Sequence, residues 1–180
     1  MARLLDILYK VSLRGVKGST DVEITDVVTD SRKVTPGSCF IAVRGTLSDG
    51  HAFIGNAISS GASAIVCEQI PAETADGVTY VEVDDAAAAV GPIAHQYFRE
   101  PSRSIQLVGV TGTNGKTTVA TLLYQLFSGL GHQCGLVSTV RYMIGDRELP
   151  STHTTPDAVS LNRLLHDMWR GGCTHVFMEC

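Results

Sequence analysis

The strongest constraint on the fold is a glycine-rich loop, VTGTNGKTT at residues 110–118, between an apolar run and a helical pattern. The run Ile105–Val110 (IQLVGV) is nearly all apolar, which predicts a buried parallel strand. Segment Thr117–Leu130 predicts a helix with one apolar face. That face comprises Val119, Leu122, Leu123, Leu126, Phe127 and Leu130. A strand, a glycine-rich loop and a helix in this order form the context of a phosphate-binding loop.

Each residue type in this loop suits the binding of a nucleotide. Gly112 and Gly115 allow a tight turn that points backbone N–H groups at an anion, and the helix N-terminus adds partial positive charge. Lys116 can reach the β- and γ-phosphates, and the Thr117 hydroxyl can ligate Mg²⁺. The loop departs from G-x-x-x-x-G-K-[ST], since Val110 stands where the first glycine belongs. The alternative is a Gly-Lys turn without a ligand, but the agreement of all the parts favours nucleotide binding.

The residues after the loop continue the alternation of predicted strands and helices. Gly135–Thr139 and His175–Met178 predict strands, and a helix is expected from Pro156 and Asp157 to the glycines at 171–172. This β-α-β…α-β order predicts a parallel sheet with right-handed crossovers. Because nothing follows Cys180, just after an apolar strand, we expect this domain to be unfinished.

Residues 1–101 predict a separate N-terminal α/β domain. Its expected strands are Ile24–Thr29, Cys39–Val43, Ala64–Glu68 and Thr79–Val83, and its expected helices are Arg3–Lys10, His51–Ser60 and Asp84–Phe98, the last kinked at Gly91-Pro92. The polar, proline-containing segment 99–104 predicts a hinge, so the second domain spans residues 104–180. The expected class is α/β, with the first part of a mononucleotide-binding parallel-sheet domain after the N-terminal domain.

Composition excludes several classes of protein. Among 180 residues, 44% are hydrophobic and 18% charged, which excludes a disordered chain, and a net charge of −4 argues against a nucleic-acid partner. Asp6 interrupts the N-terminal apolar run, and no run approaches the ~20 apolar residues of a membrane span, so we expect a cytoplasmic protein.

The five cysteines form no C-x-x-C pair and predict reduced thiols, buried for Cys39, Cys67, Cys134 and Cys173.

Two segments resemble the Mur ligases, the enzymes that build the peptidoglycan stem peptide. Gly112–Thr118 (GTNGKTT) resembles the ATP loop of that family. Residues 29–42 (TDSRKVTPGSCFIA) resemble its N-terminal D-S-R…P-G…F-x-A signature, which Asp49-Gly50-His51 and Ala57–Ala62 continue.

Two later segments narrow the resemblance within the family. His153–Asp157 (HTTPD) is similar to a segment of the members that add the third residue of the peptide. His175–Glu179 (HVFME) resembles the strand that carries their magnesium-ligating glutamate. The resemblance covers the whole chain but only the front part of such an enzyme.

The resemblance implies an ATP-dependent ligase that phosphorylates the carboxylate of UDP-MurNAc-L-Ala-D-Glu, after which the amine of an amino acid attacks the acyl-phosphate. It implies ATP binding by Gly112, Thr113, Asn114, Gly115, Lys116, Thr117 and Thr118, and Mg²⁺ binding by Thr117 and Glu179, with Lys116 and Glu179 catalytic. It implies contacts to the UDP-MurNAc-dipeptide from Thr29, Ser31, Thr46, Leu47, Ser48, His153, Thr154 and Thr155. Diaminopimelate is the expected amino acid, as the commoner case in the family, with L-lysine as the alternative.

Other interpretations stay open at this point. From the residues alone, Asp30-Ser31-Arg32 predicts a strand-end turn with local hydrogen bonds, and Glu179 a solvated carboxylate. We expect the 180 residues to be a monomer that is inactive alone, because the family's carbamylated lysine and specificity motif lie beyond residue 180. The alternative functions are a non-catalytic module that binds a UDP-sugar or nucleotide, and an unrelated P-loop kinase.

Overall fold

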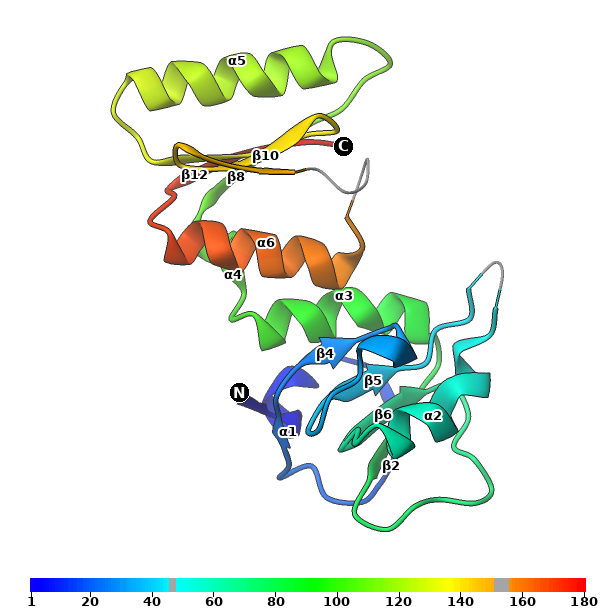
Figure 1. The fold of residues 1–180 in the computed structure, drawn as a ribbon. Coiled ribbons are helices and arrows are strands. Elements are labelled where there is room, and N and C mark those ends of the chain that lie inside the picture. Colours follow the sequence, from blue (N-terminus) through cyan, green and yellow to red (C-terminus); the bar gives the residue numbers. More distant parts are fainter. Residues whose placement is uncertain (46–47, 151–155) are drawn as a thin grey trace. The chain divides into compact units, whose positions relative to one another are not determined.

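The computed structural model describes residues 1–45, 48–150 and 156–180. The chain divides into two compact units, Met1–Tyr97 (unit 1) and Phe98–Cys180 (unit 2), each built from helices on a five-stranded sheet (Figure 1). The expected polar hinge is partly helical, because Pro101 starts the short helix α4 (Pro101–Ser104).

Unit 1 contains a mixed sheet whose strand order is β2-β7-β6-β5-β4. The strands are β2 (Leu13–Lys17), β7 (Thr79–Val83), β6 (Ala64–Cys67), β5 (Cys39–Ile41) and β4 (Val27–Val28). All neighbours are parallel except β2, which pairs antiparallel with β7. Strand β2 was not predicted, because it lies at an edge and exposes most of its side chains, so it has no alternating pattern.

The expected single strand Ile24–Thr29 was wrong. Its first residue belongs to β3 (Glu23–Ile24), which pairs with β1 (Ala2–Arg3) in a small separate sheet, and β4 then joins the main sheet. The chain changes sheets at residues 25–26, where Thr25 donates its backbone N–H to Gly37 O. The segment predicted as one strand therefore covers parts of two elements with different partners.

The helices of unit 1 cover both faces of its main sheet (Figure 1). They are α1 (Leu4–Ile7), η1 (Ser31–Lys33), η2 (Gly50–Phe53), α2 (Ile54–Ser59) and α3 (Ala86–Tyr97). Helix α2 buries Ile54 and Ala57 in a core with Phe40 and Ile65, while α3 packs against α1 and β4. Burial of these apolar side chains is the main source of stability for this layer.

Unit 2 has the strand order β11-β10-β9-β12-β8, with α5 (Lys116–Gly129) on one face and α6 (Ala158–Arg170) on the other (Figure 1). The predicted parallel arrangement is confirmed for β8 (Gln106–Val110), β12 (His175–Glu179) and β9 (Cys134–Val137). The hairpin of β10 (Arg141–Ile144) and β11 (Arg147–Pro150) is antiparallel and was not predicted. Its two-residue Gly145-Asp146 turn was the available signal.

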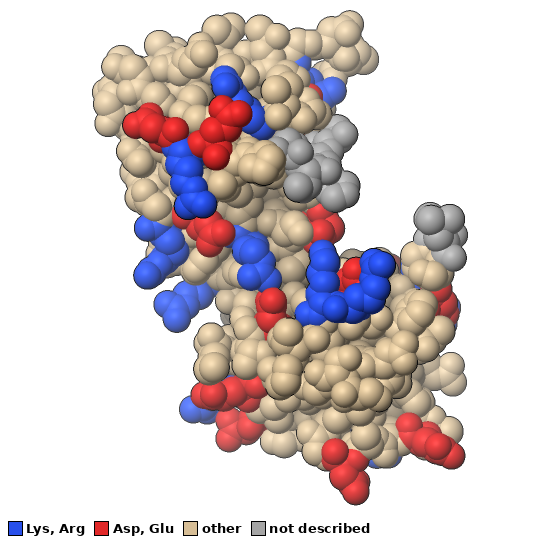
Figure 2. Space-filling view, viewed as in Figure 1, with Lys and Arg blue, Asp and Glu red and all other residues tan. Residues whose placement is uncertain are grey.

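One expectation about burial in unit 2 was wrong. Strand β8 is an edge strand rather than a buried one, and its Val108 is 39% exposed. The apolar face of α5 is wider than its contact with the sheet, so Leu123 and Phe127 pack inward together with the buried Ala120 and Tyr124. The side chains of Val119, Leu122, Leu126 and Leu130 are exposed. Figure 2 shows few charged side chains over α5, in keeping with the absence of Asp, Glu, Lys and Arg from residues 117–129.

Helix α6 begins at Ala158, slightly later than expected. Asp157 is its N-cap and accepts hydrogen bonds of 2.9 Å from the backbone N–H groups of Val159 and Ser160, so Pro156 precedes the helix instead of lying in its first turn.

The predicted burial of four of the five cysteines is confirmed. All five are free, and only Cys180 is exposed. Within residues 1–45, 48–150 and 156–180, no helix combines the length and apolarity needed to cross a bilayer.

Candidate functional site

The glycine-rich loop of unit 2 connects the end of β8 at Val110 to the start of α5 at Lys116. Gly112 has φ +146° and Gly115 has φ +77°, so a side chain at either position would be strained. Gly115 is also the N-cap of α5. The backbone N–H groups in the first turn of a helix have no partner within that helix. The loop therefore presents free donors and the positive end of a helix dipole, which together suit an anion.

The side chain of Lys116 folds back over this loop. Its Nζ donates a 2.9 Å hydrogen bond to the carbonyl oxygen of Gly112, and this hydrogen bond is exposed to solvent. The ammonium group is thus held at the loop and stays accessible to a ligand. This placement matches the phosphate-binding role predicted for Lys116.

Glu179 lies beside the start of the loop. Residue 179 on β12 is paired in register with Val110 on β8, and the backbone N–H of Cys180 donates to Val110 O at 2.9 Å. This register brings the Glu179 carboxylate to α5, where the Thr117 hydroxyl donates to Glu179 Oε2 at 2.9 Å. The structure therefore brings together the two residues that were predicted to ligate a metal ion.

Thr139 is a third member of this cluster, and sequence reasoning missed it. Its backbone N–H and its hydroxyl lie 3.1 Å and 3.2 Å from Glu179 Oε2, the same oxygen that Thr117 contacts. Thr139 follows β9, which is parallel to β12 and adjacent to it. Polar residues directly after neighbouring parallel strands meet at one edge of a sheet, so Ser138-Thr139 was the available signal.

The surroundings keep the Glu179 carboxylate charged. Burial by itself raises the pKa of Glu179, but hydrogen bonds from Thr139 and Thr117, with the charge of Lys116, outweigh burial and hold the pKa below its usual value. The described part of the chain contains no cluster of three or more His, Cys, Asp and Glu arranged to hold a metal ion. A hydroxyl and a carboxylate are hard oxygen donors, and they fit Mg²⁺, which typically takes one or two carboxylates and completes its shell with water and phosphate oxygens.

Unit 1 carries the second predicted site at the end of β4. Asp30 is the N-cap of η1, and Ser31 is the first residue of that helix. Asp30 accepts hydrogen bonds from the backbone N–H of Arg32 at 3.0 Å and from its Nε and Nη2 at 2.9 Å and 2.8 Å. The hydrogen bonds from the Arg32 side chain and backbone lower the pKa of Asp30 to about 2. The local hydrogen-bonded turn is therefore present, and substrate contacts by Thr29 and Ser31 stay a prediction.

The other predicted substrate residues are only partly described. Ser48 is exposed and precedes Asp49, the N-cap of η2, whose carboxylate accepts from the backbone N–H of His51 at 2.9 Å. Thr46, Leu47, His153, Thr154 and Thr155 lie outside the described residues.

Two family models match the chain, one over each unit. The model described as "Mur ligase family, catalytic domain" matches residues 23–98, and the "Mur ligase middle domain" matches residues 110–180. The chain belongs to the Mur ligase family. The predicted family resemblance and the predicted α/β class are both confirmed.

Curated relatives in this family are similar along nearly the whole chain. The protein named UDP-N-acetylmuramoyl-L-alanyl-D-glutamate–2,6-diaminopimelate ligase from Cytophaga hutchinsonii is 55% identical over 178 residues, which is 98% of this chain and 37% of the relative. The Bacteroides fragilis protein of the same name is 51% identical over 177 residues, again 98% of this chain and 36% of the relative. The chain therefore spans little more than a third of the length of these relatives.

Solved structures of Mur ligases share the fold. A UDP-N-acetylmuramoyl-L-alanyl-D-glutamate–2,6-diaminopimelate ligase superposes with a TM-score of 0.79 at 24% identity, over 99% of this chain and 36% of that one. The MurF ligase from Thermotoga maritima, solved in complex with ADP, has a TM-score of 0.58 at 27% identity, over 86% of this chain and 31% of that one.

Proposed function

We propose that this Mur ligase chain is the front part of an ATP-dependent ligase that joins meso-diaminopimelate to UDP-MurNAc-L-Ala-D-Glu. The observation that carries the proposal is the contact between Thr117 and Glu179 at the glycine-rich loop. It puts a hydroxyl and a charged carboxylate where a nucleotide on the loop would present its phosphates. The relatives at 55% and 51% identity bear the name of a diaminopimelate ligase, which favours this amino acid over L-lysine.

Unit 2 supplies the groups for phosphoryl transfer in this proposal. The loop N–H groups and Lys116 hold the phosphates of ATP, and Thr117 and Glu179 hold Mg²⁺, which supplies neutralisation of charge on the phosphates. Thr139 keeps the Glu179 carboxylate in place through two hydrogen bonds. The protein thereby positions the γ-phosphoryl group for transfer to the substrate carboxylate.

Unit 1 holds the uridine end of the substrate in this proposal. Thr29, Ser31 and Ser48, with the predicted Thr46 and Leu47, provide hydroxyl and backbone groups for it. His153, Thr154 and Thr155 serve the sugar and peptide portions. Residues 1–101 and 104–180 thus form a UDP-MurNAc-binding domain and a partial ATP-binding domain, which act as a monomer in the cytoplasm, where ATP is available.

A second candidate function follows from how little of the relatives the chain spans. At 37% of the length of its Cytophaga hutchinsonii relative, the chain alone would bind a UDP-sugar and a nucleotide without joining an amino acid. This candidate concerns the 180 residues, whereas the ligase concerns the protein to which they belong.

Phosphate release tests the proposal in a protein that contains these residues and the continuation found in the relatives. With ATP, Mg²⁺ and UDP-MurNAc-L-Ala-D-Glu present, we expect phosphate release to require meso-diaminopimelate and to be at least tenfold slower with L-lysine. The 180-residue chain alone should release none above background. Faster release with L-lysine would overturn the choice of amino acid, and release by the isolated chain would overturn its assignment as a partial enzyme.

A further inference from the structure

Four residues of unit 1, from the segment between β5 and η2 and from the end of β6, form a closed ring of contacts through three side chain–side chain contacts and one backbone N–H. Arg44 Nε lies 3.2 Å from Glu68 Oε2 and 3.6 Å from Asp49 Oδ2. His51 Nδ1 lies 2.7 Å from Asp49 Oδ1, and His51 Nε2 accepts a 3.0 Å hydrogen bond from the backbone N–H of Glu68. Arg44 and Asp49 flank the loop that contains Ser48, and Glu68 directly follows β6. The ring therefore joins Arg44, Asp49 and His51 to the end of β6.

Backbone hydrogen bonds also connect the residues on either side of this turn. Arg44 and Asp49 form an antiparallel bridge, and Gly50 N–H donates to Val43 O at 2.9 Å. A Cβ on Gly50 would come within 2.6 Å of Val43 O and 2.8 Å of Val43 N, so only glycine fits this crossing. Gly45 N–H closes the turn by donating to Ser48 O at 3.0 Å.

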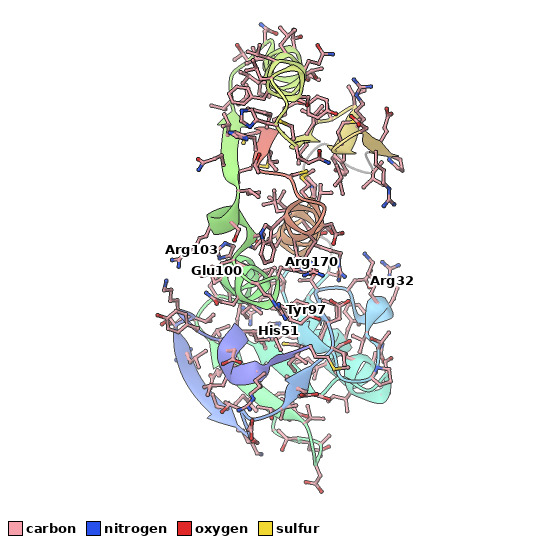
Figure 3. All side chains as sticks on the ribbon, turned by 90° about the vertical axis from the view of Figure 1, so that its left-hand side faces the viewer. Arg32, His51, Tyr97, Glu100, Arg103 and Arg170 are labelled. Atoms are coloured by element: carbon pink, nitrogen blue, oxygen red, sulfur yellow. The ribbon has the colours of Figure 1, made fainter. Side chains whose placement is uncertain are left out.

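The hydrogen bonds of His51 define its tautomer. A backbone N–H can only donate, so Nε2 must be the acceptor toward Glu68, and the ring proton lies on Nδ1, where it donates to Asp49. The His51 side chain is 16% exposed, against 50% for Asp49. The spacing of the histidines in the sequence indicates only a surface residue here, whereas both nitrogens of the His51 imidazole have hydrogen-bond partners. Figure 3 labels His51 among the side chains of unit 1.

A further hydrogen bond supports this ring of contacts. Glu68 Oε1 accepts a 3.3 Å hydrogen bond from the backbone N–H of Ala86, the first residue of α3. A cavity of about 300 Å³ opens beside the ring, lined by Arg44, Asp49, His51, Ile54 and residues 69–72. Arg44, Asp49 and His51 are thus connected to the end of β6 and also line this cavity.

We propose that His51 is a positioning residue that holds Asp49, and with it the adjacent Ser48, in the arrangement that receives the uridine diphosphate end of the substrate. This inference rests on the proposed function, which places the uridine end of UDP-MurNAc-L-Ala-D-Glu on unit 1. Both imidazole nitrogens act together: Nδ1–H orients the Asp49 carboxylate, and Nε2 accepts the hydrogen bond from the backbone N–H of Glu68. Arg44 completes the same connection from the other end of the loop.

Calorimetric titration of the 180-residue chain with UDP-MurNAc-L-Ala-D-Glu tests the role of His51. H51F keeps a planar ring but removes both hydrogen bonds, and we expect it to weaken binding at least tenfold. H51Q can accept from Glu68 N–H through its oxygen and donate to Asp49 through its nitrogen, so it should restore binding to within about threefold of the unsubstituted chain. Neither substitution should change the affinity for MgATP, which binds in unit 2. H132F, the same exchange on an exposed histidine of unit 2, serves as the control and should leave UDP-ligand binding unchanged.

The outcomes separate this inference from the proposed function. If the unsubstituted chain does not bind the UDP ligand, the proposed function of unit 1 fails. If it binds and S31A weakens binding, but H51F binds as tightly as the unsubstituted chain, the role of His51 alone is refuted. Equal losses in H51F and H51Q would also refute it. Should H51F not fold, R44Q breaks the ring at the opposite side, and an unchanged UDP-ligand affinity in R44Q would refute the inference.

Discussion

The Thr117 hydroxyl donates to Glu179 Oε2 at 2.9 Å, although 62 positions separate the two residues in the chain. The contact arises because β8 and β12 are adjacent and parallel, so the loop after one strand meets the end of the other. Thr117 on the loop and Glu179 on the sheet can therefore act on one ligand. Strand pairing thus assembles the proposed magnesium site.

Removal of the Thr117 hydroxyl should weaken the effect of Mg²⁺ on nucleotide binding. T117V keeps the size and branching of the side chain but removes the oxygen, whereas T117S keeps the oxygen. We expect Mg²⁺ to tighten ATP binding to the unsubstituted chain and to T117S. In T117V the factor by which Mg²⁺ tightens ATP binding should be about tenfold smaller, which corresponds to roughly 1.4 kcal/mol. Calorimetry with Mg²⁺ and with EDTA measures the gain, and an undiminished gain in T117V would refute the proposed metal role of Thr117.

Thr139 should make a smaller contribution to the same site. T139V removes the hydroxyl bond to Glu179 but keeps the backbone N–H bond at 3.1 Å, so part of the support for the carboxylate persists. A single hydrogen bond to a charged group contributes about 1.5–3 kcal/mol at most, and here a second bond compensates. We expect T139V to raise the Mg²⁺ concentration needed for half-maximal ATP binding about threefold, and T139S to restore it. Identical Mg²⁺ titrations for T139V and the unsubstituted chain would contradict this role.

Only one of the five thiols should react in the folded chain. Cys39, Cys67, Cys134 and Cys173 are buried and Cys180 is exposed. Burial raises the pKa of Cys39 to about 12 and that of Cys67 to about 11, so these thiols are protonated as well as shielded at pH 8. Since the thiolate is the reactive form, a colorimetric thiol assay at pH 8 should count one thiol before denaturation and five after it. Loss of the fast-reacting thiol in C180S identifies it, and rapid reaction of two or more thiols would show that the core is open.

A side chain at Gly135 should be destabilising, because a Cβ there would meet Met168 Sδ at 2.7 Å and Val176 Cγ2 at 3.0 Å. Strand β9 is thus packed closely against α6 and β12. We expect G135A to lower the free energy of unfolding of unit 2 by about 1–3 kcal/mol, the usual cost of overpacking. The matched control is G129A at the end of α5, where a Cβ would meet nothing within 4 Å. Chemical denaturation that ranks G129A as the less stable variant would contradict the described packing.

Asp30 should give unit 1 a small dependence of stability on pH. Its folded pKa of about 2 lies below the usual 3.8, so its contribution is present above pH 4 and is lost as the pH falls from 4 to 2. The Arg32 side chain is 88% exposed, and solvent screening limits the effect to about 0.5 kcal/mol. D30N keeps a capping side chain but removes the charge, so it should flatten the loss of stability in this pH range. An equally steep acid transition in D30N would assign the pH dependence to other groups.

Local patterns predicted the parts of the fold that depend on neighbours in the sequence. The loop at 110–118 was predictable because glycines, a lysine and a threonine at fixed spacing specify its backbone and chemistry together. The same holds for the strand Thr79–Val83. These features depend on a few adjacent residues, so tertiary context had little scope to change them.

The remaining features depend on contacts between distant residues. The exposure of Leu122 and Leu126 reflects which half of α5 meets the sheet, which periodicity alone does not determine. Thr139 contacts Glu179 only because β9 lies next to β12, and the sequence of neither strand alone specifies this strand order. His51 likewise obtains its role from Glu68, 17 positions away.

Paired titrations of the 180-residue chain test the central claim most directly, namely that unit 1 binds the UDP end of the substrate and unit 2 binds ATP. UDP-MurNAc-L-Ala-D-Glu and MgATP are titrated separately into the unsubstituted chain, S31A and K116A. The account predicts that S31A weakens only the UDP ligand and that K116A weakens only MgATP, each by at least tenfold. Loss of both ligands in one folded variant, or binding of the UDP ligand that is unaffected by S31A, would contradict it.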